Sequence, residues 1–178
     1  MNVIALIILA TIVFDLILKG MADYFNLKML RPDLPEPFRN VYDPEQYRKS
    51  QEYLRVNTRF GWITATFNVV LILAFWFAKG FPWLDQWVRS WNFGPILSGL
   101  IFIGILGLLK AVLALPFSVY DTFVIEERFG FNKTTWSTFV LDLFKGLALA
   151  IVLGTPLLAG VLAFFEYAGA NGWWYCWI

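Results

Sequence analysis

Histidine is absent from this chain, and Cys176 is its only cysteine. Zinc sites in proteins are built from His, Cys and carboxylate ligands, and a nucleophilic Ser or Cys is usually activated by a nearby His. The sequence therefore offers neither a His/Cys zinc site nor a His-assisted nucleophile, and one thiol cannot close an intrachain disulfide. We expect this chain to contain no catalytic residue, no metal ligand and no cofactor of its own.

Three charged residues interrupt the apolar N-terminal segment at a helical spacing. Asp15, Lys19 and Asp23 recur every four residues, so a helix places them on one face. Because a charge within a bilayer is costly, this stripe should face protein or water. Alternatively, all three residues lie near a membrane boundary and reach its headgroups. The same two alternatives apply to Lys110, whose long side chain can more easily extend its charge to the headgroups.

The elements that position these charges are membrane helices. Of the 178 residues, 59% are hydrophobic and 15% are charged, which is typical of a membrane protein. The balance of 14 Lys and Arg against 13 Asp and Glu lacks the basic surface that binds nucleic acid. Apolar runs of this length predict an all-α membrane protein, a bundle of four complete transmembrane helices plus the start of a fifth. The spans are residues 3–25, 60–78, 91–115 and 146–166, and 173–178 begin a further span. 

Lysine and arginine are shared unevenly among the three loops that join the spans. The first loop carries seven of them and the third carries three, whereas the second holds only Lys79 and Arg89. Since cytoplasmic loops retain positive charge, we expect two large helical cytoplasmic loops, the first and third, and an N-terminus that is outside or lumenal. Trp83, Trp87 and Trp91 suit the opposite interface. A cleaved signal peptide fits the first span poorly, because no cationic residue precedes it.

The first large loop carries a strong helix start. Asp43 as N-cap, followed by Pro44, predicts one helix that continues through the second span and projects beyond the membrane. The projecting part either packs against another cytoplasmic element or is an ordinary solvated extension. Its packing face is expected to carry Tyr47, Gln51, Leu54 and Thr58.

The third loop contains two helix stops. Pro116 should kink or end the third span, and Gly130 should end a short helix that follows it. A cap among residues 132–135 should then begin the helix that enters the fourth span. Within the spans, Asn68 should bond to another helix, and five glycines should allow close helix packing. They are Gly99, Gly104, Gly107, Gly154 and Gly160.

These two loops resemble those of the type I CAAX prenyl endopeptidases, a family of integral-membrane zinc metalloproteases. The third loop contributes Leu115-Pro-Phe-Ser118, Phe123-Val-Ile-Glu-Glu127, Phe129-Gly-Phe-Asn-Lys-Thr134 and the step from Asp142 to Lys145. The first loop contributes Arg31-Pro, Tyr47-Arg-Lys-Ser-Gln-Glu-Tyr53 and Thr58-Arg-Phe-Gly61. The likeness covers essentially all 178 residues.

The resemblance implies the N-terminal membrane domain of such a protease, truncated before its zinc-binding half. In the family, zinc is held by a His-Glu-x-x-His helix and a downstream Glu, beside a large water-filled chamber enclosed by membrane helices. We expect this chain to be inactive alone and zinc to be bound by the full-length protein. The candidate chamber-lining residues are Asp15, Lys19, Asp23 and Lys110. The candidate residues for docking the catalytic half, or for touching substrate, are Glu126, Glu127, Asn132 and Asp142.

The expected partners are the lipid bilayer, the missing catalytic half and, for the full-length enzyme, a peptide or protein substrate. An incomplete bundle also invites self-association. The alternative function is a non-enzymatic membrane scaffold that binds partner proteins through the first and third loops. A small transporter is a third hypothesis, supported only by the charged stripe.

Overall fold

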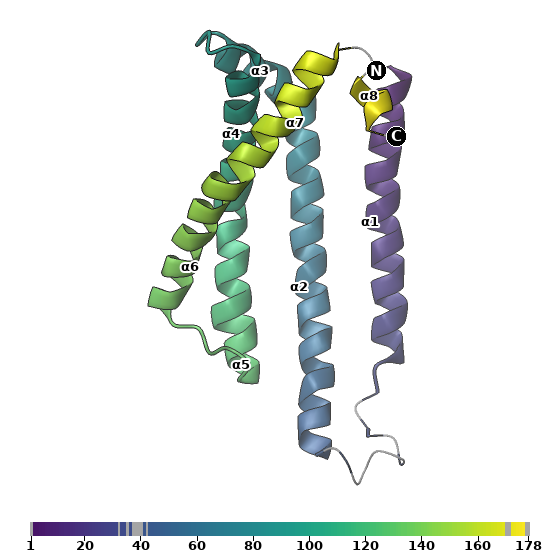
Figure 1. Ribbon diagram of the computed structural model, residues 1–178. Coiled ribbons are helices and arrows are strands. Elements are labelled where there is room, and N and C mark those ends of the chain that lie inside the picture. The colour runs from purple at the N-terminus through teal and green to yellow at the C-terminus, as the bar shows by residue number, and fades with distance from the viewer. Residues whose placement is uncertain are drawn as a thin grey trace. The chain divides into compact units, whose positions relative to one another are not determined.

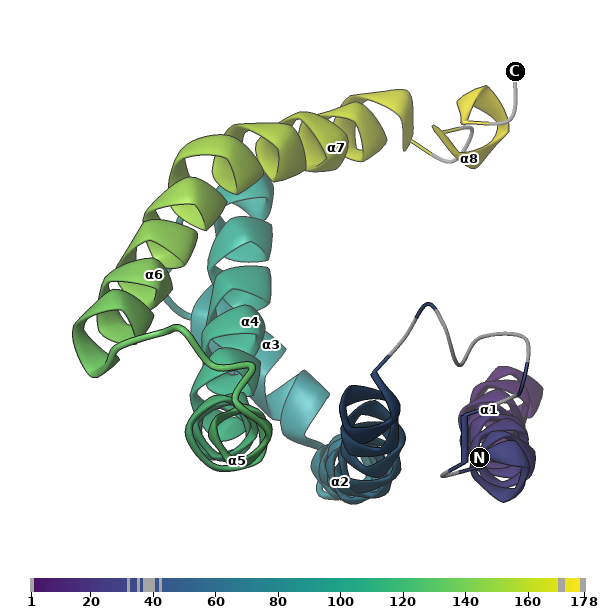
Figure 2. The ribbon, with the colours of Figure 1, turned by 90° about the horizontal axis from the view of Figure 1, so that it is seen from below.

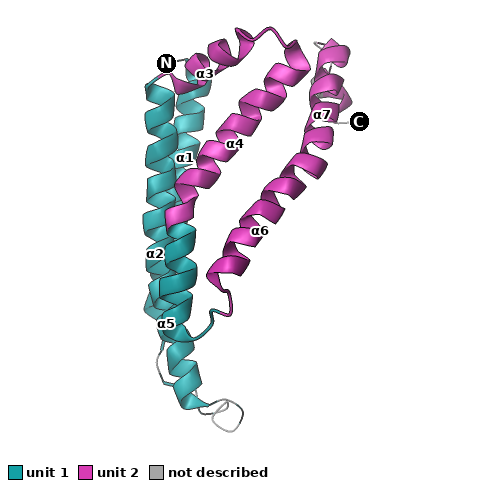
Figure 3. Ribbon diagram, turned by 90° about the vertical axis from the view of Figure 1, so that its left-hand side faces the viewer, with its two compact units in different colours: residues 1–78, 117–132 teal, residues 79–116, 133–178 magenta. Residues whose placement is uncertain are grey.

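The computed structural model describes residues 2–31, 33, 34, 36, 41, 43–169 and 172–176. Most of these residues are helical, and none of them lies in a strand. Four helices are long and apolar enough to cross a membrane, as predicted (Figure 1). They are Val3–Met29 (α1), Pro44–Phe77 (α2), Pro95–Phe129 and Trp136–Ala168. The chain divides into two compact units (Figure 3), residues 1–78 with 117–132 and residues 79–116 with 133–178.

In the first unit, α1 and α2 run in opposite directions (Figure 1) and are in contact with each other. The Asn2 side chain caps α1 by accepting a hydrogen bond from the Ala5 amide at 2.8 Å. Asp43 caps α2 by accepting from the Glu45 amide at 2.8 Å. With Pro44 in the first turn, α2 then continues unbroken to Phe77, which confirms the single long helix.

The third span differs from its prediction at both ends. It begins as α4 (Pro95–Tyr120) and not at Trp91, because Asn92 and Gly94 adopt positive φ angles of 58° and 81° in a preceding turn. Of the two predicted effects of Pro116, a kink or an end, the end is wrong, since the helix continues through that residue. Membrane helices tolerate such a proline when neighbouring groups satisfy the freed backbone.

The short helix predicted after Pro116 is therefore part of the same helical path. A π-helical turn (η2, Asp121–Glu126) follows α4 directly, and a last turn (α5, Glu127–Phe129) follows η2. Gly130 ends the path at φ 70°, the left-handed conformation that glycine adopts without strain, as predicted. Residues 117–132 belong to the first unit, where η2 packs against α2.

The second unit contains α3 (Gly80–Arg89), a helix within the predicted second loop, and most of α4. The fourth span consists of α6 (Trp136–Leu149), a π-helical turn (η3, Ala150–Gly154) and α7 (Thr155–Ala168). Thr135 caps α6 by accepting from the Thr138 amide at 3.2 Å, within the predicted 132–135 window. The short helix α8 (Gly172–Tyr175) follows.

The helical path changes direction between α6 and α7 (Figure 2). Pro156 stands in the first turn of α7, immediately after η3. A proline lacks the amide that a continuous helix needs and its ring crowds the preceding turn, so a π-turn before it accommodates the bend.

The predictions for small and polar residues within the spans are partly wrong. A Cβ on Gly99 would lie 2.9 Å from Leu162 Cδ1, so this glycine does allow α4 and α7 to approach. The other four glycines have nothing within 4 Å of such a Cβ. Asn68 donates to the Thr64 carbonyl of its own helix at 2.9 Å and not to another helix.

Very few side chains of the described residues are buried. They are Leu34, Ile125 and Phe129 in the first unit and Leu84, Val88 and Ser98 in the second. Most apolar side chains along the four spans are exposed, which is typical of membrane helices, because lipid tails solvate apolar side chains as well as a protein core does.

Candidate functional site

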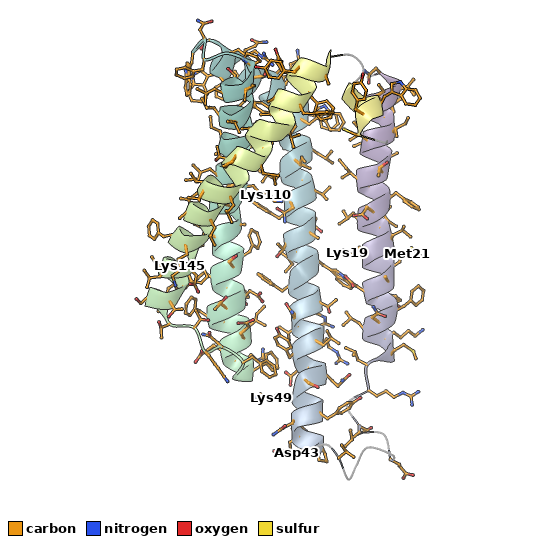
Figure 4. All side chains as sticks on the ribbon, viewed as in Figure 1. Lys19, Met21, Asp43, Lys49, Lys110 and Lys145 are labelled. Atoms are coloured by element: carbon orange, nitrogen blue, oxygen red, sulfur yellow. The ribbon has the colours of Figure 1, made fainter. Side chains whose placement is uncertain are left out.

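The predicted charged stripe on α1 separates into two environments. Asp23 is half-buried and accepts a hydrogen bond from the indole Nε1 of Trp62 on α2 at 3.0 Å. Asp15 and Lys19 are exposed, and neither has a hydrogen bond or ion pair with the described part of the chain. Figure 4 shows Lys19 and Met21 on different sides of α1. Asp23 therefore belongs to the contact between α1 and α2, and the other two charges do not.

The bond between Asp23 and Trp62 allows depth in the membrane to be counted along the helices. Trp62 precedes the end of α2 at Phe77 by fifteen residues, about 22 Å at the usual helical rise of about 1.5 Å. Because α1 runs in the opposite direction (Figure 1), Lys19 lies about 6 Å nearer the level of Phe77 than Asp23 does, and Asp15 lies about 12 Å nearer. With Phe77 taken as one boundary of a core roughly 30 Å thick, this count puts Lys19 close to the midplane.

Lys110 lies on α4, within the third span. It is exposed and has no hydrogen bond or ion pair within the described residues (Figure 4). Counted from Pro95 it lies about 22 Å along the helix. Whether Lys110 lines a chamber or extends its long side chain to the headgroups stays a prediction.

The third loop is fastened to the projecting part of α2 by aromatic rings. Tyr53 packs edge-on against Phe129 with ring centroids 5.4 Å apart and against Phe131 at 4.9 Å. Phe129 is the best buried of the three, with 3% of its surface exposed. Arg128 donates to Glu52 at 3.1 Å beside these rings, so the end of the third span is held at a fixed level on α2. We refer to Glu52, Tyr53, Arg128, Phe129 and Phe131 as the loop clamp.

Three of the four predicted docking residues lie together at this clamp. The Glu126 carbonyl accepts from the amides of Phe131 and Asn132 at 2.9 and 3.3 Å. Asn132 Nδ2 donates to Glu127 Oε2 at 3.0 Å. These bonds order the turn after α5. Asp142 lies in the other compact unit, on α6, where Lys145 donates to it at 3.3 Å.

The projecting part of α2 does pack against another element, and its ring contacts are made by Tyr53, which the predicted face does not include. Within the predicted face Leu54 is 45% exposed, whereas Tyr47, Gln51 and Thr58 are half-buried. The contacting aromatic residues recur every seven positions, at Tyr53, Phe60 and Phe67. Phe60 meets Tyr120 at 5.1 Å, and Phe67 meets Phe117 at 4.8 Å. This aromatic spacing is the sequence signal that identifies the true packing face.

Sequence reasoning also missed Asp121, at the first position of η2. Its Oδ1 atom is buried and has no hydrogen-bond partner in the described structure. An unsatisfied carboxylate oxygen of this kind costs free energy in the folded state. No sequence signal distinguishes Asp121 from the exposed carboxylates of the same loop.

The described residues do not fit a zinc ion. They include no group of three or more His, Cys, Asp or Glu side chains that could hold a metal, and Cys176 is exposed. Tetrahedral zinc sites need three or four such ligands within about 2.3 Å of the metal. What the described residues provide is a set of membrane spans, an exposed lysine without a partner among them on the first span, and an ordered loop.

The fold defines a multi-pass integral membrane domain, and sequence comparison assigns its family. The sequence model described as CAAX prenyl protease N-terminal, five membrane helices, matches residues 23–178. The chain therefore belongs to the CAAX prenyl protease N-terminal family, which confirms the resemblance predicted from the loop motifs. 

Individual relatives agree with this assignment. The chain is 28% identical over 173 residues to the CAAX prenyl protease 1 homolog of Oryza sativa subsp. japonica, covering 90% of this chain and 40% of the rice protein. It is 30% identical over 158 residues to the CAAX prenyl protease 1 of Saccharomyces cerevisiae, covering 83% and 35%. 

A solved structure shows the same fold. The crystal structure of S. mikatae Ste24p matches with a TM-score of 0.86 and 28% identity, covering 96% of this chain and 41% of that chain. The chain thus spans about two-fifths of the length of these relatives.

Proposed function

We propose that this chain is the membrane-embedded N-terminal domain of a zinc-dependent CAAX prenyl protease-like endopeptidase, lines a water-filled chamber and is inactive alone. The observation that carries this proposal is Lys19, an exposed cation without a hydrogen bond or ion pair to the described residues, which the count from Phe77 puts near the membrane midplane. A lysine facing lipid at that depth costs about 3 kcal/mol, and the midplane is beyond the reach of its stem. Water in a chamber removes this cost, and Asp15 extends the same polar surface.

We also propose that the first and third loops dock the catalytic half. The loop clamp supports this docking role. It fixes Glu126, Glu127 and Asn132 in one ordered turn at the end of a span. The catalytic half is expected to hold the zinc and to act on a peptide or protein substrate. The positive charge of these loops favours a cytoplasmic location for them, with the N-terminus outside or lumenal.

Cysteine accessibility tests the chamber wall. The full-length protein is prepared with Cys176 and any further cysteine replaced by serine, and Lys19→Cys, Asp15→Cys and Met21→Cys are introduced one at a time. Met21 is a matched control, because it lies near the depth of Lys19 on a different side of α1 (Figure 4). In proteoliposomes, a charged, membrane-impermeant thiol reagent is expected to label positions 15 and 19 and to leave position 21 unlabelled. Equal labelling of positions 19 and 21, or none at 15 and 19, would contradict a chamber wall.

Metal analysis separates the protease from the scaffold alternative. The full-length protein is expected to bind one zinc ion per chain and to cleave a prenylated peptide, whereas residues 1–178 alone do neither. A full-length protein without stoichiometric zinc and without peptidase activity would favour the scaffold.

Docking is tested in the same full-length protein by Asn132→Ala combined with Asp142→Ala. This variant is expected to lower turnover or the thermal midpoint. Unchanged turnover together with an unchanged midpoint would argue against a docking role for these residues.

A further inference from the structure

The helix α3 is held at the membrane boundary by its connections. Only Ala78 and Lys79 separate it from the end of α2, and residues 90–94 separate it from the start of α4. Lys79 at φ 57° and Asn92 at φ 58° turn the chain sharply at these connections, so neither of them is extended. Even a fully extended chain reaches no more than about 3.5 Å per residue. Because the helices on both sides are membrane spans, α3 lies at the level where those spans leave the apolar core.

The faces of α3 are sharply different. Gly80, Leu84 and Val88 recur every four residues and are buried, with Leu84 and Val88 each only 1% exposed. A second stripe at the same spacing carries Trp83 and Trp87, and Trp91 continues it beyond the helix end. These three side chains are exposed, Trp83 by 63%. We refer to Trp83, Trp87 and Trp91 as the tryptophan ridge.

The ridge is a continuous aromatic surface. The rings of Trp83 and Trp87 stack with centroids 6.0 Å apart, and Trp87 meets Trp91 edge-on at 4.9 Å. Phe93 extends the series at 6.0 Å from Trp91. None of the three indole N–H groups donates a hydrogen bond to the part of the chain that the structure describes. An indole of this kind combines an apolar ring with a free donor, which suits the glycerol and ester region of a bilayer.

The charges of α3 point to a neutral lipid surface. Arg89 Nε donates to both oxygens of Asp85 at 2.9 Å, and these hydrogen bonds, with the opposite charge of Asp85, raise the pKa of the Arg89 guanidinium. The pair is therefore ionised and internally compensated, and Lys79 is the remaining cation of the segment from Lys79 to Gly94. Amphipathic helices that depend on anionic lipids carry many more basic residues on the polar face.

We propose that α3 is an interfacial helix whose tryptophan ridge is buried in the headgroup and ester region of a zwitterionic phospholipid leaflet. The ridge then fixes the depth at which α2 ends and α4 begins. Because α4 is one continuous helix, the depth of each residue on it, including Lys110, depends on the depth at which α3 is held. This inference needs only the membrane location of the spans and does not rest on the proposed chamber or on protease activity.

Depth-dependent fluorescence quenching tests the proposal. The protein is reconstituted in phosphatidylcholine brominated either at acyl carbons 6 and 7 or at carbons 11 and 12. Because the chain has 9 Trp, the ridge signal is taken as the difference between the wild type and a variant with Trp83→Phe, Trp87→Phe and Trp91→Phe. Trp83→Phe alone is a second variant in case the triple substitution disturbs folding, and Trp62→Phe is the control for an indole that is hydrogen-bonded within the protein.

The ridge signal is expected to be quenched at least about twofold more by the shallow bromines than by the deep ones, as for a helix that inserts about 5–10 Å. The quenching should be the same when phosphatidylglycerol is added. The proposal is overturned if the signal is unquenched by both lipids or if quenching requires the anionic lipid. It is also overturned if quenching appears only at high dilution of protein in lipid, because a second copy of the chain then covers the ridge.

Discussion

Asp23 on α1 and Trp62 on α2 form a hydrogen bond of 3.0 Å between the first two membrane spans. The two residues are separated by 39 positions in the sequence, and most side chains of α1 and of the span part of α2 are apolar. Apolar side chains permit helices to slide past one another with little penalty, whereas a hydrogen bond has one favourable position. This bond therefore sets the register of α1 on α2 and, with it, the depth of Asp15 and Lys19.

Replacing Trp62 by phenylalanine tests this register. The substitution keeps an aromatic ring but removes the donor, so the half-buried Asp23 carboxylate loses its partner. We expect a loss of about 1–3 kcal/mol in the free energy of unfolding, measured in mixed micelles with increasing SDS. Trp76→Phe is the control, because Trp76 stacks on Phe77 in the same helix and makes no hydrogen bond with the described residues. Equal effects of the two substitutions would show that the hydrogen bond is unimportant.

The loop clamp depends mainly on Phe129. Only 3% of its surface is exposed and its ring packs against Tyr53, so Phe129→Ala should cost about 3–5 kcal/mol of unfolding free energy. The same variant should be cleaved much faster by a protease between residues 127 and 136. Phe131→Ala provides the comparison, since Phe131 touches Tyr53 but is 49% exposed, and its effect should be clearly smaller. Similar protease resistance of wild type and Phe129→Ala would contradict the clamp.

The ion pair between Glu52 and Arg128 should contribute little to the same clamp. Both side chains are more than half exposed, so water screens their attraction. A double-mutant cycle with Glu52→Gln and Arg128→Gln is expected to give a coupling energy below about 1 kcal/mol, falling further in salt. A coupling of several kcal/mol would mean that the pair is shielded from solvent, contrary to the exposure of both side chains.

The predictable part of this fold follows from patterns that are repeated along the chain. Apolar runs define the four spans, and local signals at Asp43, Gly130 and Thr135 fix where helices begin or end. Such signals depend on a few adjacent residues, so they can be recognised without knowing which other helices each segment packs against. The helix α3 was missed because its ten residues are too short to span a membrane and its apolar positions alternate with tryptophans that also suit a loop.

The faces and partners within the spans were much less predictable. The α2 packing face was assigned to Leu54 and its neighbours, whereas the structure packs Tyr53 and Phe60 against the third span. In a membrane helix nearly every side chain is apolar, so hydrophobicity no longer distinguishes a protein-facing side from a lipid-facing one. For the same reason the sequence could not separate Asp23, which has a partner on α2, from Asp15 and Lys19, which have none in the described structure.

Asp121 should destabilise the protein in its present form. Its Oδ1 atom is buried without a hydrogen-bond partner in the described structure, and replacing the carboxylate by a neutral amide lowers the cost of burial. Asp121→Asn is therefore expected to raise the thermal midpoint at neutral pH. Asp142→Asn should not, because Asp142 is exposed and pairs with Lys145. A lowered midpoint in Asp121→Asn would contradict an unsatisfied carboxylate at this position.

Gly99 and Leu162 supply the clearest test of helix packing within the second unit. A methyl group at position 99 would lie 2.9 Å from Leu162 Cδ1, closer than carbon atoms normally approach, so Gly99→Ala should force this leucine to move. We expect a loss of at most about 1 kcal/mol, because the atom that must move is the end of a flexible, half-buried side chain, and Leu162→Ala in the same chain should recover part of it by removing the clash. Gly104→Ala on the same helix has no atom within 4 Å of the new methyl group and should be neutral or slightly stabilising. A double variant no more stable than the sum of its single substitutions would show that α4 and α7 do not pack through this pair, because independent sites are additive and sites in contact are not.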